Sequence, residues 1–98
     1  MKKSELVSAV AATAQITKAD AARAVDAVIT TVANELAAGG SVAFLGFGRF
    51  DTRLRAERQG RNPITGKEIT IPAAYVPRFK ASTQLKEMVA EIPVPAED

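Results

Sequence analysis

The spacing of the apolar residues changes once along this chain of 98 residues, at Gly39 and Gly40. Before these glycines the apolar residues recur every three or four positions, as on one face of a helix, and after them they alternate with polar residues, as on a half-buried strand. A glycine pair is typical of a helix end because glycine adopts left-handed backbone conformations easily. The sequence therefore predicts an α+β fold in which helices come first and an antiparallel sheet follows.

Two helices are expected before the glycine pair. The first has an apolar stripe through Leu6, Val7, Val10 and Ala14. Thr17 is a suitable N-cap for the second, and Asp20 stands three residues later, as in a capping box. The apolar face of this second helix contains Val25, Val28, Ile29, Val32 and Leu36. The short connection predicts a helical hairpin; a helix-turn-helix DNA reader is the alternative, but the second helix lacks the basic residues that such a reader places in a groove.

Three antiparallel strands are expected after the helices. The first passes through Val42 and Phe44, and a glycine-rich turn, "GFG", separates it from a second strand through Phe50 and Leu54. The third strand lies in "KEITIPAAYVPRFKAS", whose two prolines predict an edge position or a bulge, because proline donates no ladder hydrogen bond. A short C-terminal helix follows, with Ser82 as its N-cap.

The segment between Glu57 and Glu68 has no buried-core pattern. The second and third strands are therefore expected to overrun the sheet and form a protruding two-stranded β-ribbon arm, about residues 53–75, with "GRNPITGK" at its tip. We expect one domain over residues 1–98, with a flexible tail over about residues 92–98. Large core-filling side chains are few, with four Phe, one Tyr and no Trp, which favours burial by a second subunit.

Positive charge is concentrated in the second half of the chain. Residues 49–86 carry nine basic and three acidic side chains, whereas residues 1–48 are balanced and the last residues are acidic, so the net charge is only +2. A basic segment of this kind indicates a polyanionic partner, with a solvated charged surface as the alternative. Because only Asp51, Glu57 and Glu68 lie near them, the arm arginines cannot all be neutralised locally and are expected to be free for phosphates.

Catalysis, metal binding and cofactor binding are not expected. The chain contains no Cys and no His, which excludes disulfides and thiolate zinc sites and removes the commonest general base. Asp51 and Glu57 are interleaved with arginines, so we interpret them as exposed ion-pair partners. Residues 60–67 differ from a nucleotide-binding phosphate loop because Glu68 replaces the magnesium-binding hydroxyl. Glu5 interrupts the N-terminal apolar run, so we predict neither a signal peptide nor a membrane span.

The predicted tip of the arm combines a rigid apolar ring with hydrogen-bond donors. Pro63 has a flat ring with no rotamer entropy to lose, a shape that can wedge between stacked base pairs. Arg61 and Asn62 beside it can donate to acceptors in the minor groove. An ordinary turn is the alternative for these residues, since Pro63 sets φ and Gly66 accepts a positive φ. The four arm arginines, on a ribbon that serves no core, favour the DNA wedge.

Three stretches, "LGFGRF", "GRNPITGKEI" and "VPRFKAS", lie in this order behind the two helices and resemble the histone-like bacterial DNA-bending family of HU and the integration host factor subunits. The resemblance covers residues 1 to about 90 and is greatest to HU, because of "ITIPAAYVPRFKA" after the arm. It implies a non-catalytic, largely sequence-independent DNA-binding and DNA-bending protein of the bacterial cytoplasm and nucleoid. It also implies an intertwined dimer, either a homodimer or a heterodimer with a related subunit, and arms that enter the minor groove. Bent, nicked or gapped double-stranded DNA is the expected partner, because it is already partly unstacked.

The resemblance assigns roles to individual residues. Pro63 becomes the intercalating residue, and the shared dimer core contains Phe44, Phe47, Phe50 and Phe79. The residues implied to contact DNA are Lys3, Lys18, Arg53, Arg55, Arg58, Arg61, Asn62, Pro63, Lys67, Lys80 and Lys86. Thr83 and Tyr75 stand where the family often has basic residues, and the acidic tail is longer than usual, so these departures bear on affinity. An integration-host-factor-like subunit with site preference, an RNA-binding β-ribbon and a module for an acidic protein partner are the alternatives.

Overall fold

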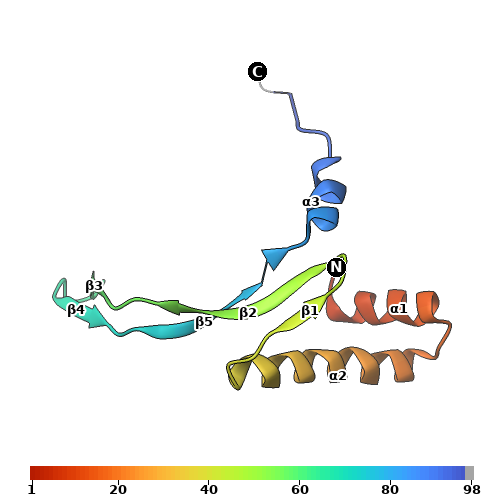
Figure 1. Ribbon diagram of the computed structural model, residues 1–98, viewed down its shortest axis with the longest axis horizontal. Helices are drawn as coiled ribbons and strands as arrows, with labels where there is room; N and C mark the ends of the chain where they lie inside the picture. Colours follow the sequence, from red (N-terminus) through yellow and green to blue (C-terminus); the bar gives the residue numbers. More distant parts are fainter. Residues whose placement is uncertain (97–98) are drawn as a thin grey trace.

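The computed structural model describes residues 1–96. Along these residues two helices are followed by a sheet with a long extension and by a third helix (Figure 1). The helices are α1 (Lys3–Ala14), α2 (Lys18–Ala37) and α3 (Thr83–Ala90), and the strands are β1 (Val42–Phe44), β2 (Gly48–Arg55), β3 (Arg58–Arg61), β4 (Glu68–Ile71) and β5 (Ala74–Ala81). The predicted α+β order, with helices before an antiparallel sheet, is confirmed.

Helices α1 and α2 form an antiparallel hairpin (Figure 1). Thr17 is the N-cap of α2, as predicted, and its hydroxyl accepts a hydrogen bond from the backbone N–H of Asp20 at 3.1 Å. The helix ends just before Gly39, which has a φ of +84°. An ion pair of 2.5 Å between Lys3 and Asp26 joins the two helices at the surface.

Strand β2 is the centre of a three-stranded sheet of order β1-β2-β5, and both of its pairings are antiparallel. Strand β2 begins at Gly48, a position that favours glycine because a Cβ there would lie 2.7 Å from the carbonyl oxygen of Lys80 and from the ring of Phe79 on β5. The two prolines lie where the sequence predicted them to be tolerated. Pro77 is in β5, at the edge of the sheet, and Pro72 is in the gap between β4 and β5.

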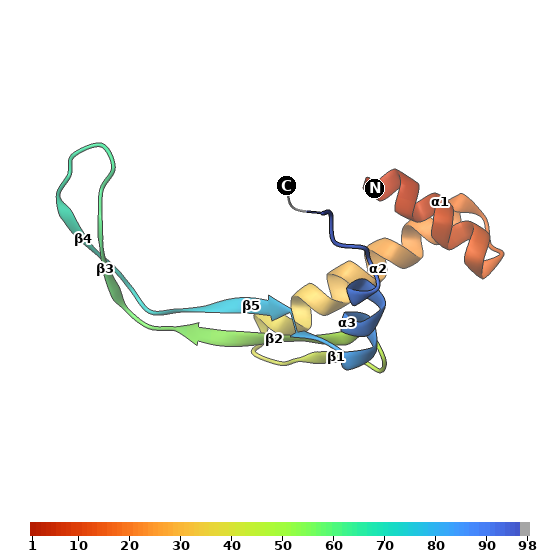
Figure 2. The same cartoon turned by 90° about the horizontal axis from the view of Figure 1, so that it is seen from above.

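A long two-stranded extension leaves the sheet. Strands β2 and β5 stay paired up to Arg55, which lies opposite Ala74, and after a break β3 and β4 form a second antiparallel pair. We call residues 52–55 with 74–77 the inner ribbon, and β3, β4 and the loop of residues 62–67 the outer ribbon. The outer ribbon rises steeply from the line of the inner ribbon (Figure 2). The radius of gyration is therefore 19.2 Å, against about 13 Å for a compact domain of this length.

The buried core of the described residues is very small. It consists of Val7, Ala11 and Ala21, where α1 meets α2. The four phenylalanines form an aromatic cluster on the sheet, with ring centroids 4.8–6.2 Å apart, yet Phe47 in this cluster is still 48% exposed. An open apolar groove of about 690 Å³ runs between α2 and the sheet; it is lined by Leu6, Val28, Ile29, Val32, Ala33, Leu36, Phe44, Phe47, Phe50 and Pro77. One protomer alone therefore leaves its main apolar face uncovered.

Helix α3 stands apart from the helical hairpin at the other end of β5 (Figure 1). Ser82 is its N-cap, as predicted, and accepts a hydrogen bond from the backbone N–H of Leu85 at 3.1 Å. The described part of the predicted tail, residues 92–96, contains neither helix nor strand, and its last residues, Glu97 and Asp98, lie outside the described residues.

Candidate nucleic-acid interface

The two faces of the β2–β5 pair differ in chemistry. The register places Arg49 opposite Lys80 and Asp51 opposite Arg78, so charged residues face one another across the strands. Between these pairs, Phe50 lies opposite Phe79, and Thr52 lies opposite Pro77, on the face that carries the aromatic cluster. The charged face continues through Arg53 and Arg55 into the arm. The sheet therefore carries a mainly cationic face, with Asp51 as its one acidic residue on β2, that extends into the inner ribbon.

Asp51 is the one acidic residue of β2, and basic side chains surround it. Arg78 donates two hydrogen bonds to its carboxylate, of 2.9 and 3.0 Å, and Arg49 lies 3.7 Å away. The hydrogen bond from Arg78 and the charges of Arg78, Arg49 and Lys80 hold the pKa of Asp51 below its ordinary value of 3.8. The expected role as an ion-pair partner is confirmed, but the expectation of an exposed carboxylate is wrong, since the side chain is only 15% exposed.

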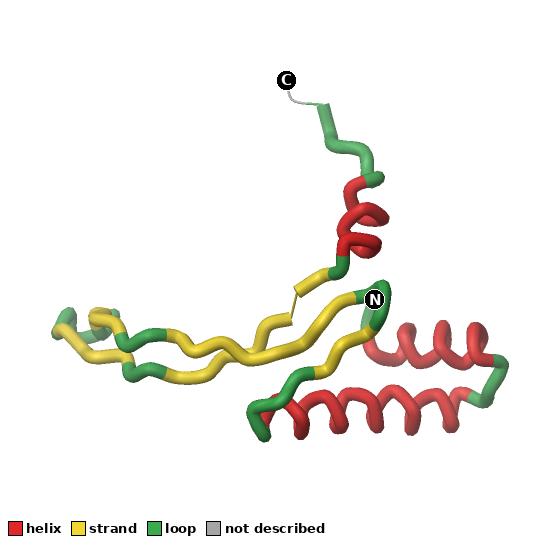
Figure 3. Tube along the Cα trace, in the orientation of Figure 1, coloured by secondary structure: helices red, strands yellow, loops and turns green. Residues whose placement is uncertain are grey.

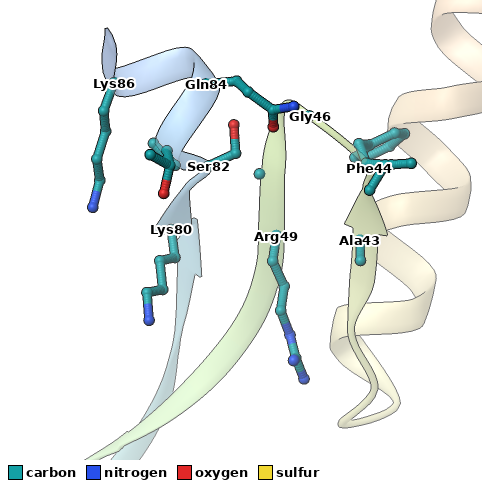
Figure 4. A pocket seen from close by; sticks show the side chains of 12 residues that line it. Ala43, Phe44, Gly46, Arg49, Lys80, Ser82, Gln84 and Lys86 are labelled. Carbon is teal, nitrogen blue, oxygen red and sulfur yellow. The ribbon is translucent and has the colours of Figure 1, made fainter.

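Three basic side chains lie near one another where β2, β5 and α3 come together. Arg49 of β2, Lys80 of β5 and Lys86 of α3 line one shallow pocket, and Figure 4 shows their side chains extending in the same direction. Lys80 and Lys86 were predicted to contact DNA, whereas Arg49 was not. Its place on the cationic face follows from strand alternation with Arg53. The hydroxyl of Ser41 accepts a hydrogen bond of 3.3 Å from the Arg49 guanidinium.

The arm continues the cationic face beyond the sheet. Arg53, Arg58 and Lys67 are exposed, and within residues 1–96 no cation of the arm forms an ion pair. Arg55 is half-buried, and its guanidinium donates to the carbonyl oxygen of Pro72 at 3.4 Å. Within the described residues, Asp51, Glu57 and Glu68 therefore form no ion pair with the cations of the arm.

The tip is a loop held by its own hydrogen bonds. The Oδ1 atom of Asn62 accepts from the backbone N–H groups of Ile64 and Thr65, at 2.8 and 3.3 Å. The Asn62 carbonyl accepts from the N–H of Gly66 at 2.8 Å, and Gly66 has a φ of +71°. Pro63 is exposed at this tip. Because Oδ1 is used inside the loop, the Asn62 amide group is left to act as a donor, which is the role predicted for it in a minor groove.

The remaining predicted contact residues lie in different places. Arg61, beside the tip, donates to the carbonyl oxygen of Gly66 at 3.4 Å. Lys3 and Lys18 begin α1 and α2. The connection between these helices lies at the far end of the body from the arm, so one protomer does not bring Lys18 close to the arm cations (Figure 1).

Neither a membrane anchor nor a metal centre can be assigned within the described residues. Across residues 1–96, no helix combines the length and the apolar character needed to cross a membrane. The same residues contain no cluster of three or more His, Cys, Asp or Glu side chains that could hold a metal ion.

A helical body, a cationic sheet face and a projecting ribbon with a proline at its tip are the parts of an architectural nucleic-acid-binding protein. The chain belongs to the bacterial DNA-binding protein family, whose model matches residues 1–90. The match therefore includes both ribbons and α3 and leaves out residues 91–98.

Individual relatives support the same assignment. The chain is 54% identical over 89 residues to the DNA-binding protein HU of Staphylococcus aureus, covering 91% of this chain and 99% of that protein. It is 56% identical over 89 residues to the DNA-binding protein HU-beta of Pseudomonas aeruginosa, covering 91% of this chain and 99% of that protein. Among solved structures, an Anabaena HU–DNA cocrystal structure is similar with a TM-score of 0.90 and 42% identity, covering 93% of this chain and 99% of that one. HU from Thermotoga maritima has a TM-score of 0.63 and 29% identity, covering 91% of this chain and 98% of that one.

The family assignment confirms the resemblance inferred from the three sequence stretches. It also confirms the prediction of a non-catalytic DNA-binding protein.

Proposed function

We propose that this protein acts as a dimer that grips double-stranded DNA between two arms and bends it. The observation that carries the proposal is the ribbon itself, which buries no core and presents exposed cations along its length and Pro63 at its tip. Phosphate contacts come from the arm cations Arg53, Arg55, Arg58, Arg61 and Lys67, and from the body cations Lys3, Lys18, Lys80 and Lys86. Asn62 and Arg61 donate to minor-groove acceptors while Pro63 enters between base pairs.

The energetics favour DNA that is already distorted. Elastic bending of a 20–30 bp site costs about 1–6 kcal/mol, and separating a stacked step costs a few kcal/mol more. The arm and body cations offset this by releasing counterions from the phosphates. Bent, nicked or gapped DNA has lost part of its stacking, so it binds more tightly than intact linear duplex.

A second copy of the chain is the occupant of the apolar groove. The groove is lined almost entirely by aliphatic and aromatic side chains, and the three buried core residues are too small to stabilise a monomer. Burial of Phe44, Phe47, Phe50 and Phe79 between two copies would supply the missing core and direct one arm to each side of the DNA. We propose a homodimer, while pairing with a related subunit would use the same face. One domain over residues 1–98 then acts in the cytoplasm, on the nucleoid.

The proposal is tested by the variant Pro63→Ala. This substitution removes the ring of the wedge and leaves the cations and the loop hydrogen bonds in place, because Pro63 has no N–H to lose. Bending is measured by energy transfer between dyes at the two ends of a duplex. We expect the parent protein to shorten the end-to-end distance and Pro63→Ala to leave it near that of free DNA, with the dimer intact. A bend that is the same in both proteins would remove Pro63 from the mechanism.

The choice of polymer is tested by competition. Duplex DNA, RNA duplex of the same length and an acidic polypeptide are titrated against labelled, nicked DNA at several salt concentrations. We expect duplex DNA to displace the label at a lower concentration than RNA or the polypeptide, and unlabelled nicked DNA, titrated in the same way, to displace it at a lower concentration still. Displacement by RNA or by the polypeptide at equal concentration would favour an RNA-binding or protein-binding ribbon instead.

A further inference from the structure

Arg49 lies on the middle strand of the sheet, at the body end of the cationic face. Its partners in the two ladders are Ala43 of β1 and Lys80 of β5. The short side chain of Ala43 does not cover the longer one of Arg49 (Figure 4), and the Arg49 side chain is 58% exposed. Arg49 therefore has a cation on one side and an uncovered strand on the other.

The nearest acidic group does not need Arg49 as its partner. Asp51 is two positions away on the same face of β2, and both of its carboxylate oxygens accept hydrogen bonds from Arg78, at 2.9 and 3.0 Å. The Nε atom of Arg49 is 3.7 Å from the same carboxylate, beyond hydrogen-bond distance. Because Arg78 already satisfies Asp51, balancing this carboxylate does not account for a second arginine beside it.

The Arg49 guanidinium is oriented by one hydrogen bond and keeps free donors. Its Nη2 atom donates to the hydroxyl of Ser41, just before β1, at 3.3 Å. A guanidinium has five N–H donors in a fixed plane, and within residues 1–96 the Nη1 atom of Arg49 makes no hydrogen bond. The end of this guanidinium can therefore bind two oxygens of one phosphate through parallel hydrogen bonds.

Two lysines add positive charge beside this guanidinium. Lys80 and Lys86 line the same shallow pocket as Arg49, and both are exposed and form no ion pair within residues 1–96. The N–H of Ser82 donates to the carbonyl oxygen of Phe47 at 2.9 Å, which ties the start of α3 to the turn between β1 and β2. Figure 3 shows this turn and the connection into α3 as neighbouring loop segments. The position of Lys86 beside the sheet therefore has a structural basis within one protomer.

We propose that Arg49 is a DNA-binding residue of the body, which binds a backbone phosphate outside the segment held by the arms. Lys80 and Lys86 contribute charge to the same site. The inference rests on the proposed function, because a duplex held between the arms would lie over the cationic face. The guanidinium supplies geometry as well as charge, so a lysine at this position is not equivalent: its ammonium is a compact point charge on a flexible stem.

The first measurement is the salt dependence of binding to a nicked duplex, by fluorescence anisotropy. Arg49→Ala should make the slope of log affinity against log salt shallower by about 1.8, since the proposed dimer loses two contacts of about 0.9 each. Arg49→Lys should keep the slope of the parent and bind more weakly at every salt concentration, because it keeps the charge and loses the parallel hydrogen bonds. The control is Arg23→Ala, on α2 away from the cationic face, and it should match the parent.

The second measurement identifies the phosphate itself. The nick fixes the position of the protein on the duplex, and uncharged methylphosphonates replace the phosphates one at a time on either side of it. At the phosphate that Arg49 binds, this replacement should weaken binding of the parent and of Arg53→Ala, which alters an arm residue on the same face of β2. It should leave the affinity of Arg49→Ala unchanged, because both changes remove the same interaction.

The outcomes distinguish this inference from the proposed function. An Arg49→Ala variant with the salt slope of the parent, or with the same loss as the parent at every methylphosphonate, would overturn the phosphate contact. Equal affinities of Arg49→Lys and the parent at every salt concentration would overturn the bidentate geometry. A parent that binds duplex without bending it would refute the proposed function, and the methylphosphonate series would still decide the role of Arg49.

Discussion

Removing the exposed arm arginines on either side of the break gives a quantitative test of phosphate contact. Arg53 lies on the inner ribbon opposite Val76, and Arg58 begins the outer ribbon opposite Ile71. Neither forms an ion pair within residues 1–96. Substituting both by Ala therefore removes positive charge without breaking an ion pair of the described structure.

The expected change follows from the number of charges. A protein loses about 0.9 in the slope of log affinity against log salt for each phosphate that it no longer neutralises. Two arginines in each protomer of the proposed dimer amount to four contacts, so the slope should become shallower by about 3.6. When salt is raised from 50 to 200 mM, the parent should therefore lose about 150-fold more affinity than the double variant loses.

The assay is a series of fluorescence anisotropy titrations of one labelled duplex at several salt concentrations. Arg23→Ala is the matched control, because Arg23 is an exposed arginine of α2 that forms an ion pair with Asp20, away from the cationic face. We expect the control and the parent to give the same slope. Parallel lines for the parent and the double variant would show that these two guanidiniums do not meet phosphates, and the account of the arm would fail.

Three other substitutions test separate parts of the structure. The hydrogen bonds and charge of Arg78 lower the pKa of Asp51, so the ionised carboxylate stabilises the folded state at pH values above its ordinary pKa of 3.8, and this stabilisation is lost as the pH falls. Urea unfolding from pH 7 to about pH 3 should therefore show a smaller loss of unfolding free energy in Asp51→Asn than in the parent. Ile29→Asp puts a charge in the apolar groove and should give the single-chain mass of 10.3 kDa by light scattering, where the parent gives twice that mass. Gly66→Ala strains a positive φ by about 1–2 kcal/mol in open space, so it should reduce DNA bending without altering the salt slope.

Local chemistry made much of the fold predictable. Two helix N-termini, at Thr17 and Ser82, depend on a side-chain hydroxyl that accepts a hydrogen bond from the N–H three residues later. Residues of this type at this spacing can be recognised in the sequence. The projecting ribbon could also be predicted from local sequence, because a stretch without apolar periodicity has no face to bury in a core. The Asx loop at the tip could also have been predicted, because asparagine before proline commonly accepts hydrogen bonds from the residues that follow.

Features that depend on register were not predictable. Asp51 and Arg78 are 27 positions apart, and only the pairing of β2 with β5 brings them face to face and covers the carboxylate. The inward position of Arg55 has the same origin. Its partner, the carbonyl of Pro72, becomes available only because both strands leave the ladder at the same level. The sequence shows which residues are charged, but it does not show which of them make contacts within the protein rather than remaining available to a partner.

The body and the arm differ in what holds them together. In the body, three small buried residues leave the groove between α2 and the sheet open, so in the proposed dimer its stability depends on a second copy and hence on protein concentration. In the arm tip, the hydrogen bonds of Asn62 join residues no more than five positions apart, and none of them involves the body. The tip therefore keeps its shape whether or not the body is assembled, and assembly decides only where two such tips are placed. A protein that bends DNA needs this separation, because the wedge must be rigid locally while the distance between the two wedges is set by the dimer.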